Sequence, residues 1–338
     1  MRVLDLHVDS IIQQRLFRYD IERRHRAGIG GQPLFWHADI PRMVEADYGG
    51  ACMGIHYWPR ESERGWQEMR RQIDYLNAAT ARDDRTVRVV RFEDWGRAHR
   101  EGKLALAPGV EGAHMLNGRI ERVADLAELG VAYLTLTHFS ANSAATPSMG
   151  RGANERQGLT AFGRRLVAEL NDHGVAVDLA HLNTPGVLDA CRVTQAPVLC
   201  THTGVKGVWD HARNISDDEI DAIAATGGVI GIIFAPIFLA GNLRADSEVA
   251  LDHLHYVADR VGVDHVALGS DYDGWLPTIL SDHRDCRDIH RVIEGLEGRG
   301  FTSDDVEKIV AGNALRVFRE VGQFAEKREG HPEQGGLR

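Results

Sequence analysis

Short apolar runs alternate with longer amphipathic stretches along this chain, and this alternation constrains the fold more than any other feature. Eight runs resemble strands, at 3–9, 49–58, 104–112, 131–138, 175–181, 197–203, 227–234 and 265–272. Helical stretches such as 66–84 and 159–174 separate them. Strands alternating with helices indicate parallel βαβ units, because a parallel connection needs a long crossover. The pattern predicts an α/β protein with a closed (β/α)8 barrel, and a doubly wound open sheet stays open as an alternative.

Capping residues mark the ends of several helical stretches. Thr160 and Ser216 stand where N-caps are expected, since their side chains can accept a hydrogen bond from the first turn. Gly130, Gly174 and Gly227 follow the last helical turns, where a left-handed backbone is common. These residues support the assignment of helices between the strands.

Three segments depart from the alternation. Residues 13–46 form a charged, glycine-containing insert after the first strand, and we expect a loop with short helices over the barrel top. Residues 87–91 are predicted to add an extra edge strand. The polar, glycine-rich tail at 324–338 is predicted to be disordered. Residues 1–323 are interpreted as a single domain.

Composition excludes several classes of partner. The chain has 338 residues, of which 43% are hydrophobic, and a net charge of −10, which disfavours nucleic acid or an anionic membrane as a partner. No apolar run approaches the roughly 18 residues that a membrane span needs, and no signal peptide is visible. The four cysteines have no paired spacing, as expected of thiols in a reducing compartment. We therefore expect a cytoplasmic protein.

Side chains capable of binding metal or transferring protons recur at the C-terminal ends of the predicted strands. They are His7, Asp9, Glu111, His138, His181, His202 and Asp271. In a barrel these strand ends converge on one face, where active sites are built. An apolar core gives no reason for repeated histidine at such positions. The sequence therefore predicts one shared pocket.

Several other polar residues are assigned structural roles. Asp5 lies deeper in the barrel and is expected to bond loop amides, and Asp273 is interpreted as a turn residue because the remaining ligands of a calcium loop are missing. The histidines placed in the structural class are His37, His56, His99, His114, His253, His255 and His331.

Imidazole with carboxylate, and no thiolate, favours Zn²⁺ in an open catalytic site. Two histidine-bearing half-sites with a carboxylate between them resemble a binuclear centre, with ions about 3.5–4 Å apart. Such a centre lowers the pKa of a bridging water towards about 7 and polarises a carbonyl. Asp271, if it lies outside the metal shell, is positioned to accept the proton of that water.

Several motifs, spaced in order, carry a family resemblance. The run from Gly109 to His138 is followed by VDLAH, THT and GSDYDG, and then by GNALRVF at 312–318. Together they resemble the renal (membrane) dipeptidase family of zinc peptidases, over roughly residues 3–320. The resemblance implies a (β/α)8 barrel of the metal-dependent hydrolase type with two zinc ions.

The resemblance also implies a ligand set. His7 and Asp9 match the pair that binds the first ion, and Glu111 matches the bridging carboxylate. His181 and His202 match the ligands of the second ion. Leucine and valine replace the usual glycine and asparagine of the first motif, at positions that face away from the metals.

Three further matches concern the substrate. His138 matches a residue that contacts the scissile carbonyl, and Arg213 matches the arginine that holds the C-terminal carboxylate, to which a guanidinium binds with two parallel hydrogen bonds. Asp271 matches the acid that assists proton transfer and also meets the free amine. The loops at 13–46 and 140–152 match least, and they shape the substrate pocket.

Three hypotheses follow. The leading one is a binuclear zinc dipeptidase that hydrolyses L-L or L-D dipeptides by a metal-bridged hydroxide. The second is a zinc amidase or deacylase acting on an N-acyl amino acid or related small amide. The third, a catalytically silent metal-binding module, is disfavoured because such a module needs neither Asp271 nor Arg213. The family also suggests a homodimer, although the sequence has no decisive interface stripe.

Overall fold

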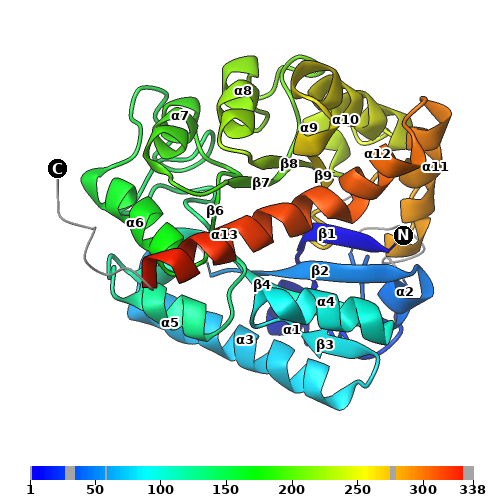
Figure 1. The fold of residues 1–338 in the computed structure, drawn as a ribbon, viewed down its shortest axis with the longest axis horizontal. Helices are drawn as coiled ribbons and strands as arrows, with labels where there is room; N and C mark the ends of the chain where they lie inside the picture. The colour runs from blue at the N-terminus through cyan, green and yellow to red at the C-terminus, as the bar shows by residue number, and fades with distance from the viewer. Residues whose placement is uncertain (1, 27–34, 58, 275–278, 330–338) are drawn as a thin grey trace.

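Eight parallel strands form a nearly closed barrel in the computed structural model, which describes residues 2–26, 35–57, 59–274 and 279–329 (Figure 1). In order around the barrel they are β1 (Val3–Val8), β2 (Tyr48–Ile55), β4 (Leu104–Glu111), β5 (Tyr133–Thr135), β6 (Ala176–Asp178), β7 (Leu199–Thr203), β8 (Val229–Ile232) and β9 (Val266–Leu268). A parallel bridge between Val8 and Tyr272 links the first and last strands. The predicted (β/α)8 barrel is confirmed, and the open-sheet alternative is wrong.

Helices surround the sheet, and α13 crosses in front of it in Figure 1. The longer ones are α3 (Glu63–Arg82), α4 (Phe92–Glu101), α5 (Arg122–Glu128), α6 (Ala161–Asp172), α7 (Thr184–Val193), α8 (Asp217–Ala225), α10 (Ser247–Val261), α11 (His290–Gly298) and α13 (Asn313–Glu329). The shorter ones are α9 (Pro236–Ala240), α12 (Ser303–Glu307), the 3-10 turns η1 (Ala113–Leu116), η2 (Val263–His265) and η3 (Cys286–Ile289), and the π-helical turn η4 (Lys308–Gly312).

The predicted caps are confirmed. The side chain of Thr160 accepts a hydrogen bond from the backbone N–H of Gly163 at 3.0 Å, at the start of α6. Ser216 begins α8 with a capping box, in which its backbone N–H donates to Glu219 at 2.8 Å. Gly130, Gly174 and Gly227 have φ values of 66°, 70° and 78°. These left-handed conformations end the helices and turn the chain into the next strand.

The extra strand predicted at 87–91 is present as β3 (Thr86–Arg88), which pairs with the first half of β4 outside the closed ring. It covers 86–88 rather than the whole predicted run. β5 pairs with the last residues of the same strand. β3 therefore lengthens the sheet locally and leaves the carboxyl end of the barrel unchanged.

The predicted insert contains two short helices, α1 (Ser10–Phe17) and α2 (Ile40–Glu45), and its residues 27–34 lie outside the described residues. Arg42 of α2 is fully buried, and its guanidinium donates to Asp39 at 2.8 Å and to Asp285 at 3.2 Å. A buried charge needs such partners. This ion-pair cluster fastens the insert to the segment that follows β9.

The tail prediction is wrong for residues 324–329, because α13 continues to Glu329. Val317, Val321 and Ala325 recur every four residues and are buried, so the apolar stripe of the helix extends past the predicted boundary. Arg328 also pairs with Asp172 at 2.9 Å. Residues 330–338 lie outside the described residues.

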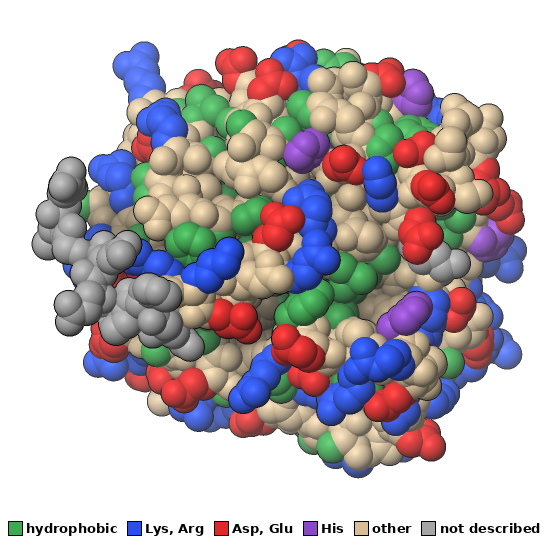
Figure 2. Space-filling view, viewed as in Figure 1, with side chains coloured by type: hydrophobic (Ala, Val, Ile, Leu, Met, Phe, Trp, Pro, Cys, Tyr) green, Lys and Arg blue, Asp and Glu red, His purple; other side chains and the backbone are tan. Residues whose placement is uncertain are grey.

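The charged surface and the four cysteines agree with the composition of the chain. On the face seen in Figure 2, acidic and basic side chains are interspersed rather than gathered into a basic patch. All four cysteines are free thiols, as expected. Within the described part of the chain, no helix combines the length and the apolar content needed to cross a membrane.

Candidate metal centre

The carboxyl end of the barrel gathers the predicted site residues. His7, Glu111 and His202 lie on β1, β4 and β7, and the other four follow the ends of β1, β5, β6 and β9. Because parallel strands all point the same way, their ends bring distant parts of the sequence together. Exposure is 5% or less for the five predicted ligands, so the group lies inside the protein.

The carboxylate of Glu111 lies at the centre of this group. Its Oε1 atom is 2.9 Å from His181 Nε2, 3.4 Å from His202 Nε2 and 3.5 Å from His138 Nε2. The same oxygen is 3.7 Å from His7 Nε2. One carboxylate oxygen thus lies close to four imidazole nitrogens that come from four different strands or strand ends.

The other half of the group forms around His7. Its Nε2 atom is 3.2 Å from Asp9 Oδ1 and 3.8 Å from Asp271 Oδ1. The candidate ligand atoms of His7, Asp9 and Asp271 all lie within 4.8 Å of one another. A second such set comprises His7, Glu111 and His202, and a third comprises Glu111, His138 and His181. The sets overlap at Glu111 and His7.

His56 also belongs to this group, although the sequence pattern placed it in the structural class. This side chain directly follows β2, and its Nδ1 atom is 4.0 Å from Glu111 Oε2. With Asp9 and Glu111 it forms another set able to hold a metal ion. Burial lowers the pKa of His56 to about 4, so its imidazole is neutral. Its position at a strand end was the signal that could have identified it.

Burial dominates the electrostatics of the group. It raises the pKa of Glu111 well above its ordinary value and that of Asp271 to about 8. Burial also holds the pKa values of His181 and His202 well below the ordinary range. For His7, burial acts downward, but the neighbouring carboxylates outweigh it and raise the pKa to about 10. Neutral imidazoles beside buried carboxylates favour a cation.

The donor atoms of the group suit divalent metal ions. Among the described residues, His7 Nε2, Asp9 Oδ1 and Glu111 Oε2 are buried and have no hydrogen-bond partner. The Nε2 atoms of His181 and His202 lie 2.9 Å from each other. Buried polar atoms normally have partners, and histidine and carboxylate donors are those that zinc prefers. The residues therefore fit a metal centre.

Supporting hydrogen bonds orient the imidazoles. The outer nitrogen Nδ1 of His7 is 2.6 Å from the Tyr133 hydroxyl, and that of His202 is 2.9 Å from Thr201 Oγ1. Asp178, which was not among the predicted site residues, accepts from the hydroxyl of Thr201 at 2.9 Å. Such outer partners fix the ring and direct Nε2 inward. Asp5 accepts from the backbone amide of His7 at 3.1 Å, as predicted for a structural role.

Arg213 and Asp271 border the group. Arg213 is 2% exposed and donates from Nη2 to the carbonyl of His202 at 2.7 Å. Its Nε atom is buried and has no partner among the described residues. Asp271 has a φ of 58°, and a Cβ at position 274 would lie 2.0 Å from its Oδ1 atom. Gly274 thus leaves the space that the Asp271 carboxylate occupies.

The turn predicted at Asp273 is present, with a φ of 69°. It also links two segments, because its carboxylate accepts from the Ser10 hydroxyl at 2.6 Å and from the backbone amide of His37 at 2.7 Å. His114 and His253 bond backbone carbonyls at 3.0 Å, which agrees with their structural assignment. The predicted structural residue His331 lies outside the described residues.

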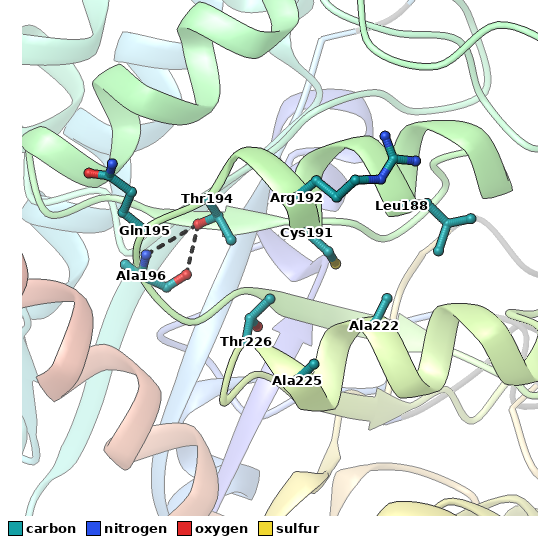
Figure 3. Close-up of a pocket in the computed structure, with 9 residues that line it drawn as sticks. All are labelled: Leu188, Cys191, Arg192, Thr194, Gln195, Ala196, Ala222, Ala225 and Thr226. Carbon is teal, nitrogen blue, oxygen red and sulfur yellow. Dashed lines mark hydrogen bonds between the residues drawn. The ribbon is translucent and has the colours of Figure 1, made fainter. Parts of the chain in front are cut away.

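Two cavities are lined by residues between 148 and 226. One, of about 340 Å³, is lined by His181 and Arg213 and therefore adjoins the metal centre. The other, of about 480 Å³, lies between α7 and α8 and is lined by residues such as Cys191, Thr194 and Ala222 (Figure 3). None of the predicted site residues lines the second cavity, and burial raises the pKa of its Cys191 thiol to about 12.

A nearly closed parallel barrel with imidazoles and carboxylates converging at its carboxyl end defines a metal-dependent hydrolase. The family model for membrane dipeptidase (peptidase family M19) matches residues 1–331. This chain belongs to that family. The predicted resemblance is confirmed, and with it the class of enzyme, a metallo-dipeptidase.

Fungal relatives agree with this membership. Dipeptidase tcpJ of Claviceps purpurea is 32% identical over 308 residues, which are 88% of this chain and 72% of the relative. Dipeptidase verJ of Clonostachys rogersoniana is also 32% identical, over 93% of this chain and 78% of the relative.

Solved structures share the fold. The dipeptidase AC, a metallopeptidase of family M19, superposes with a TM-score of 0.86 at 25% identity, covering 95% of this chain and 99% of that chain. A metallopeptidase from Rhodobacter sphaeroides, solved with a phosphinate mimic of L-Ala-D-Ala, gives a TM-score of 0.85 at 23% identity, with the same coverage.

Proposed function

We propose that this protein is a dipeptidase with two zinc ions, which cleaves dipeptides of L-L or L-D configuration. One observation carries the proposal: a single carboxylate oxygen of Glu111 lies within 3.7 Å of four imidazole nitrogens. Membership of the family and the two relatives named dipeptidases support the substrate class.

The ligand roles divide the group into two halves. His7 and Asp9 would hold one ion, His181 and His202 would hold the other, and Glu111 would be shared between the two halves. The short contacts of Glu111 with His181, and of His7 with Asp9, support this division. When bound, the ions lower the pKa of a water to about 7 and polarise the substrate carbonyl.

The remaining residues handle the substrate and its protons. Arg213 holds the C-terminal carboxylate, since its Nε–H is not engaged by any described residue. His138 contacts the scissile carbonyl oxygen as negative charge develops there. The carboxylate of Asp271 accepts the proton of the attacking water, passes it to the leaving amine, and meets the substrate's free amine. Its distance of 3.8 Å from His7 Nε2 supports a role at the edge of the metal shell.

Metal analysis and hydrolysis assays test this proposal together. Protein purified without chelator should contain about two zinc ions per chain and should hydrolyse members of an L-L and L-D dipeptide panel. Two ions without dipeptide turnover would contradict the dipeptidase and favour the amidase or deacylase, which N-acyl amino acids would then reveal. Metal at background level would contradict the metal centre itself.

Asp271→Asn separates an enzyme from a silent metal-binding module. The variant should retain its metal and lose turnover by about a hundredfold or more, because a positioned acid–base group contributes that much. Unchanged turnover would contradict the assigned role of Asp271.

Two further predictions remain from the sequence. A cytoplasmic location is supported by the four free cysteines, since disulfides are rare in that compartment. A homodimer is suggested by the family, and light scattering on the purified protein would measure the mass of the assembly.

A further inference from the structure

The cavity of about 340 Å³ beside the metal centre has a composition that points to a particular ligand. It lies among the loops that follow β5, β6 and β7, and its lining includes Ser148, His181, Lys206 and Arg213. Its volume falls in the lower part of the range for small-molecule sites, roughly 300–1,000 Å³. His181 and Arg213 connect this cavity to the residues of the proposed reaction.

Lys206 and Arg213 come from one loop. A parallel bridge between Val205 and Ile215 ties the two arms of the loop after β7 together. The backbone N–H of Lys206 donates to the carbonyl of Ile215 at 2.8 Å, which reinforces this closure. Lys206 and Arg213 therefore line the same cavity from one loop whose two arms are hydrogen-bonded together.

The two cationic side chains that line the cavity, Lys206 and Arg213, are not paired directly with either of its two carboxylates, Glu155 and Glu219. Across the described ranges, no carboxylate oxygen lies within 4.0 Å of the Lys206 ammonium, and Arg213 Nε has no hydrogen-bond partner. Glu219 also lines the cavity, but it already accepts from Ser216 at 2.8 Å and from the hydroxyl of Thr184 at 3.0 Å.

The remaining lining carboxylate belongs to Glu155, which is exposed, so water screens its charge. Ser148 also lines the cavity, and its buried hydroxyl oxygen has no hydrogen-bond partner among the described residues. The cavity thus offers a cationic group and an uncommitted hydroxyl to whatever enters it. An aliphatic side chain would leave the ammonium unpaired, whereas a carboxylate can accept from ammonium and hydroxyl donors.

We propose that this cavity is the subsite for the side chain of the substrate's C-terminal residue, and that Lys206 selects an acidic side chain there. The inference rests on the proposed function, in which Arg213 holds the C-terminal carboxylate. Lys206 then remains to bind a second carboxylate, so the favoured leaving group is an acidic amino acid such as glutamate or aspartate. Lys206 is a specificity residue, and the bond-breaking chemistry does not involve it.

A matched pair of substrates isolates the charge. Ala-Glu and Ala-Gln differ by one charge at nearly constant shape, and both are measured with the metal-loaded full chain, in L-L and L-D forms. Wild-type protein should favour Ala-Glu in kcat/KM by about tenfold, as expected when one hydrogen bond to a charged group is gained. The difference should lie mainly in KM, because the contact is made equally in the bound and transition states.

Variants of Lys206 then assign the preference. Lys206→Met should abolish the preference for Ala-Glu while leaving Ala-Gln turnover nearly unchanged. Lys206→Arg should retain much of the preference for Ala-Glu. Lys327→Met, an exposed lysine on α13, is the matched control and should keep the wild-type ratio. Equal turnover of the two peptides by wild type, or an unchanged ratio in Lys206→Met, would overturn the subsite and leave the dipeptidase proposal intact.

Failure of the proposed function gives a different result. If no dipeptide is hydrolysed, the dipeptidase proposal fails, and the same intact peptides become ligands for calorimetry. Tighter binding of Ala-Glu than Ala-Gln, lost in Lys206→Met, would still support the subsite. Equal dissociation constants would overturn it.

Discussion

Two groups of buried charged side chains lie in this protein, and they differ in whether their polar atoms are satisfied. In the Arg42 cluster, the guanidinium donates to Asp39, to Asp285 and to the carbonyl of Trp36, at 2.8, 3.2 and 2.7 Å. In the metal centre, His7 Nε2, Asp9 Oδ1 and Glu111 Oε2 are buried and have no hydrogen-bond partner among the residues described.

The difference teaches how to distinguish a structural ion cluster from a ligand site. Burial acts to raise the pKa of Asp285, but hydrogen bonds from Arg287 and the charge of Arg42 outweigh it and hold that pKa below its ordinary value. For Glu111, burial and the charge of Asp9 raise the pKa well above its ordinary value, and the charges of His7 and Arg213 are too weak to reverse this shift. A cluster that satisfies itself stabilises the fold, and one whose lone pairs converge unsatisfied is built for a cation.

Glu111→Gln should show the largest effect. Loss of the shared carboxylate should lower kcat/KM by about a thousandfold or more, because metal centres contribute several kcal/mol to transition-state stabilisation. Zinc content measured by mass spectrometry should fall as well. Glu101→Gln, an exposed glutamate at the end of α4, is the control. Full activity in Glu111→Gln would contradict the assignment of the Glu111 group as a metal site, in contrast to the structural Arg42 cluster.

Arg42→Met should show the opposite behaviour. Removing the guanidinium leaves the carboxylates of Asp39 and Asp285 buried and unpaired, which should lower the free energy of unfolding by about 3–5 kcal/mol. Urea denaturation measures this loss. Zinc content and activity per folded molecule should stay at the wild-type level, and a selective loss of metal would contradict a purely structural role.

Metal removal should lower the free energy of unfolding through the metal centre and not through the Arg42 cluster. Chelation should lower the unfolding free energy of wild type by about 2.7 kcal/mol relative to protein with free metal at a hundred times its dissociation constant. Thermal melts with and without chelator would show the shift. Arg42→Met should lose a similar amount, whereas Glu111→Gln should respond less, since it binds less metal. An equal response in Glu111→Gln would contradict the ligand assignment.

A smaller effect concerns pH. The folded pKa of Asp285 is lowered, so its contribution to stability is complete above the unfolded pKa of about 4 and is lost as the pH falls through the folded value. Asp285→Asn should therefore have a shallower decline in unfolding free energy between neutral and acidic pH. Urea midpoints at several pH values measure it, and an unchanged slope would mean that Asp285 titrates alike in both states.

Much of the architecture could be predicted because its signals are local. The eight apolar runs, the caps Thr160 and Ser216, and the glycines after the helices each depend on a few neighbouring residues. The boundary at residue 324 was wrong because it was based on the polar, glycine-rich composition of the tail. Val321 and Ala325 are buried four residues apart, and they continue the apolar face of the helix.

The site was predictable in outline for a related reason. Parallel strands place their ends on one face, so the sequence by itself brought His7, Glu111, His181 and His202 to one pocket. His56 was assigned to the structural class, although it directly follows β2, so the prediction missed a signal of the kind that identified the other histidines.

The sequence alone therefore determined the barrel and the identity of the residues at its carboxyl end, because strand period and helix caps are written in short stretches. Only the tertiary structure decided which polar atoms are satisfied. Asp178 behind His202, the closed ion pairs of Arg42 and the uncommitted Lys206 each depend on side chains that approach from distant segments. Whether a polar atom is buried, and whether it has a hydrogen-bond partner, depends on tertiary packing and is not encoded in any local sequence pattern.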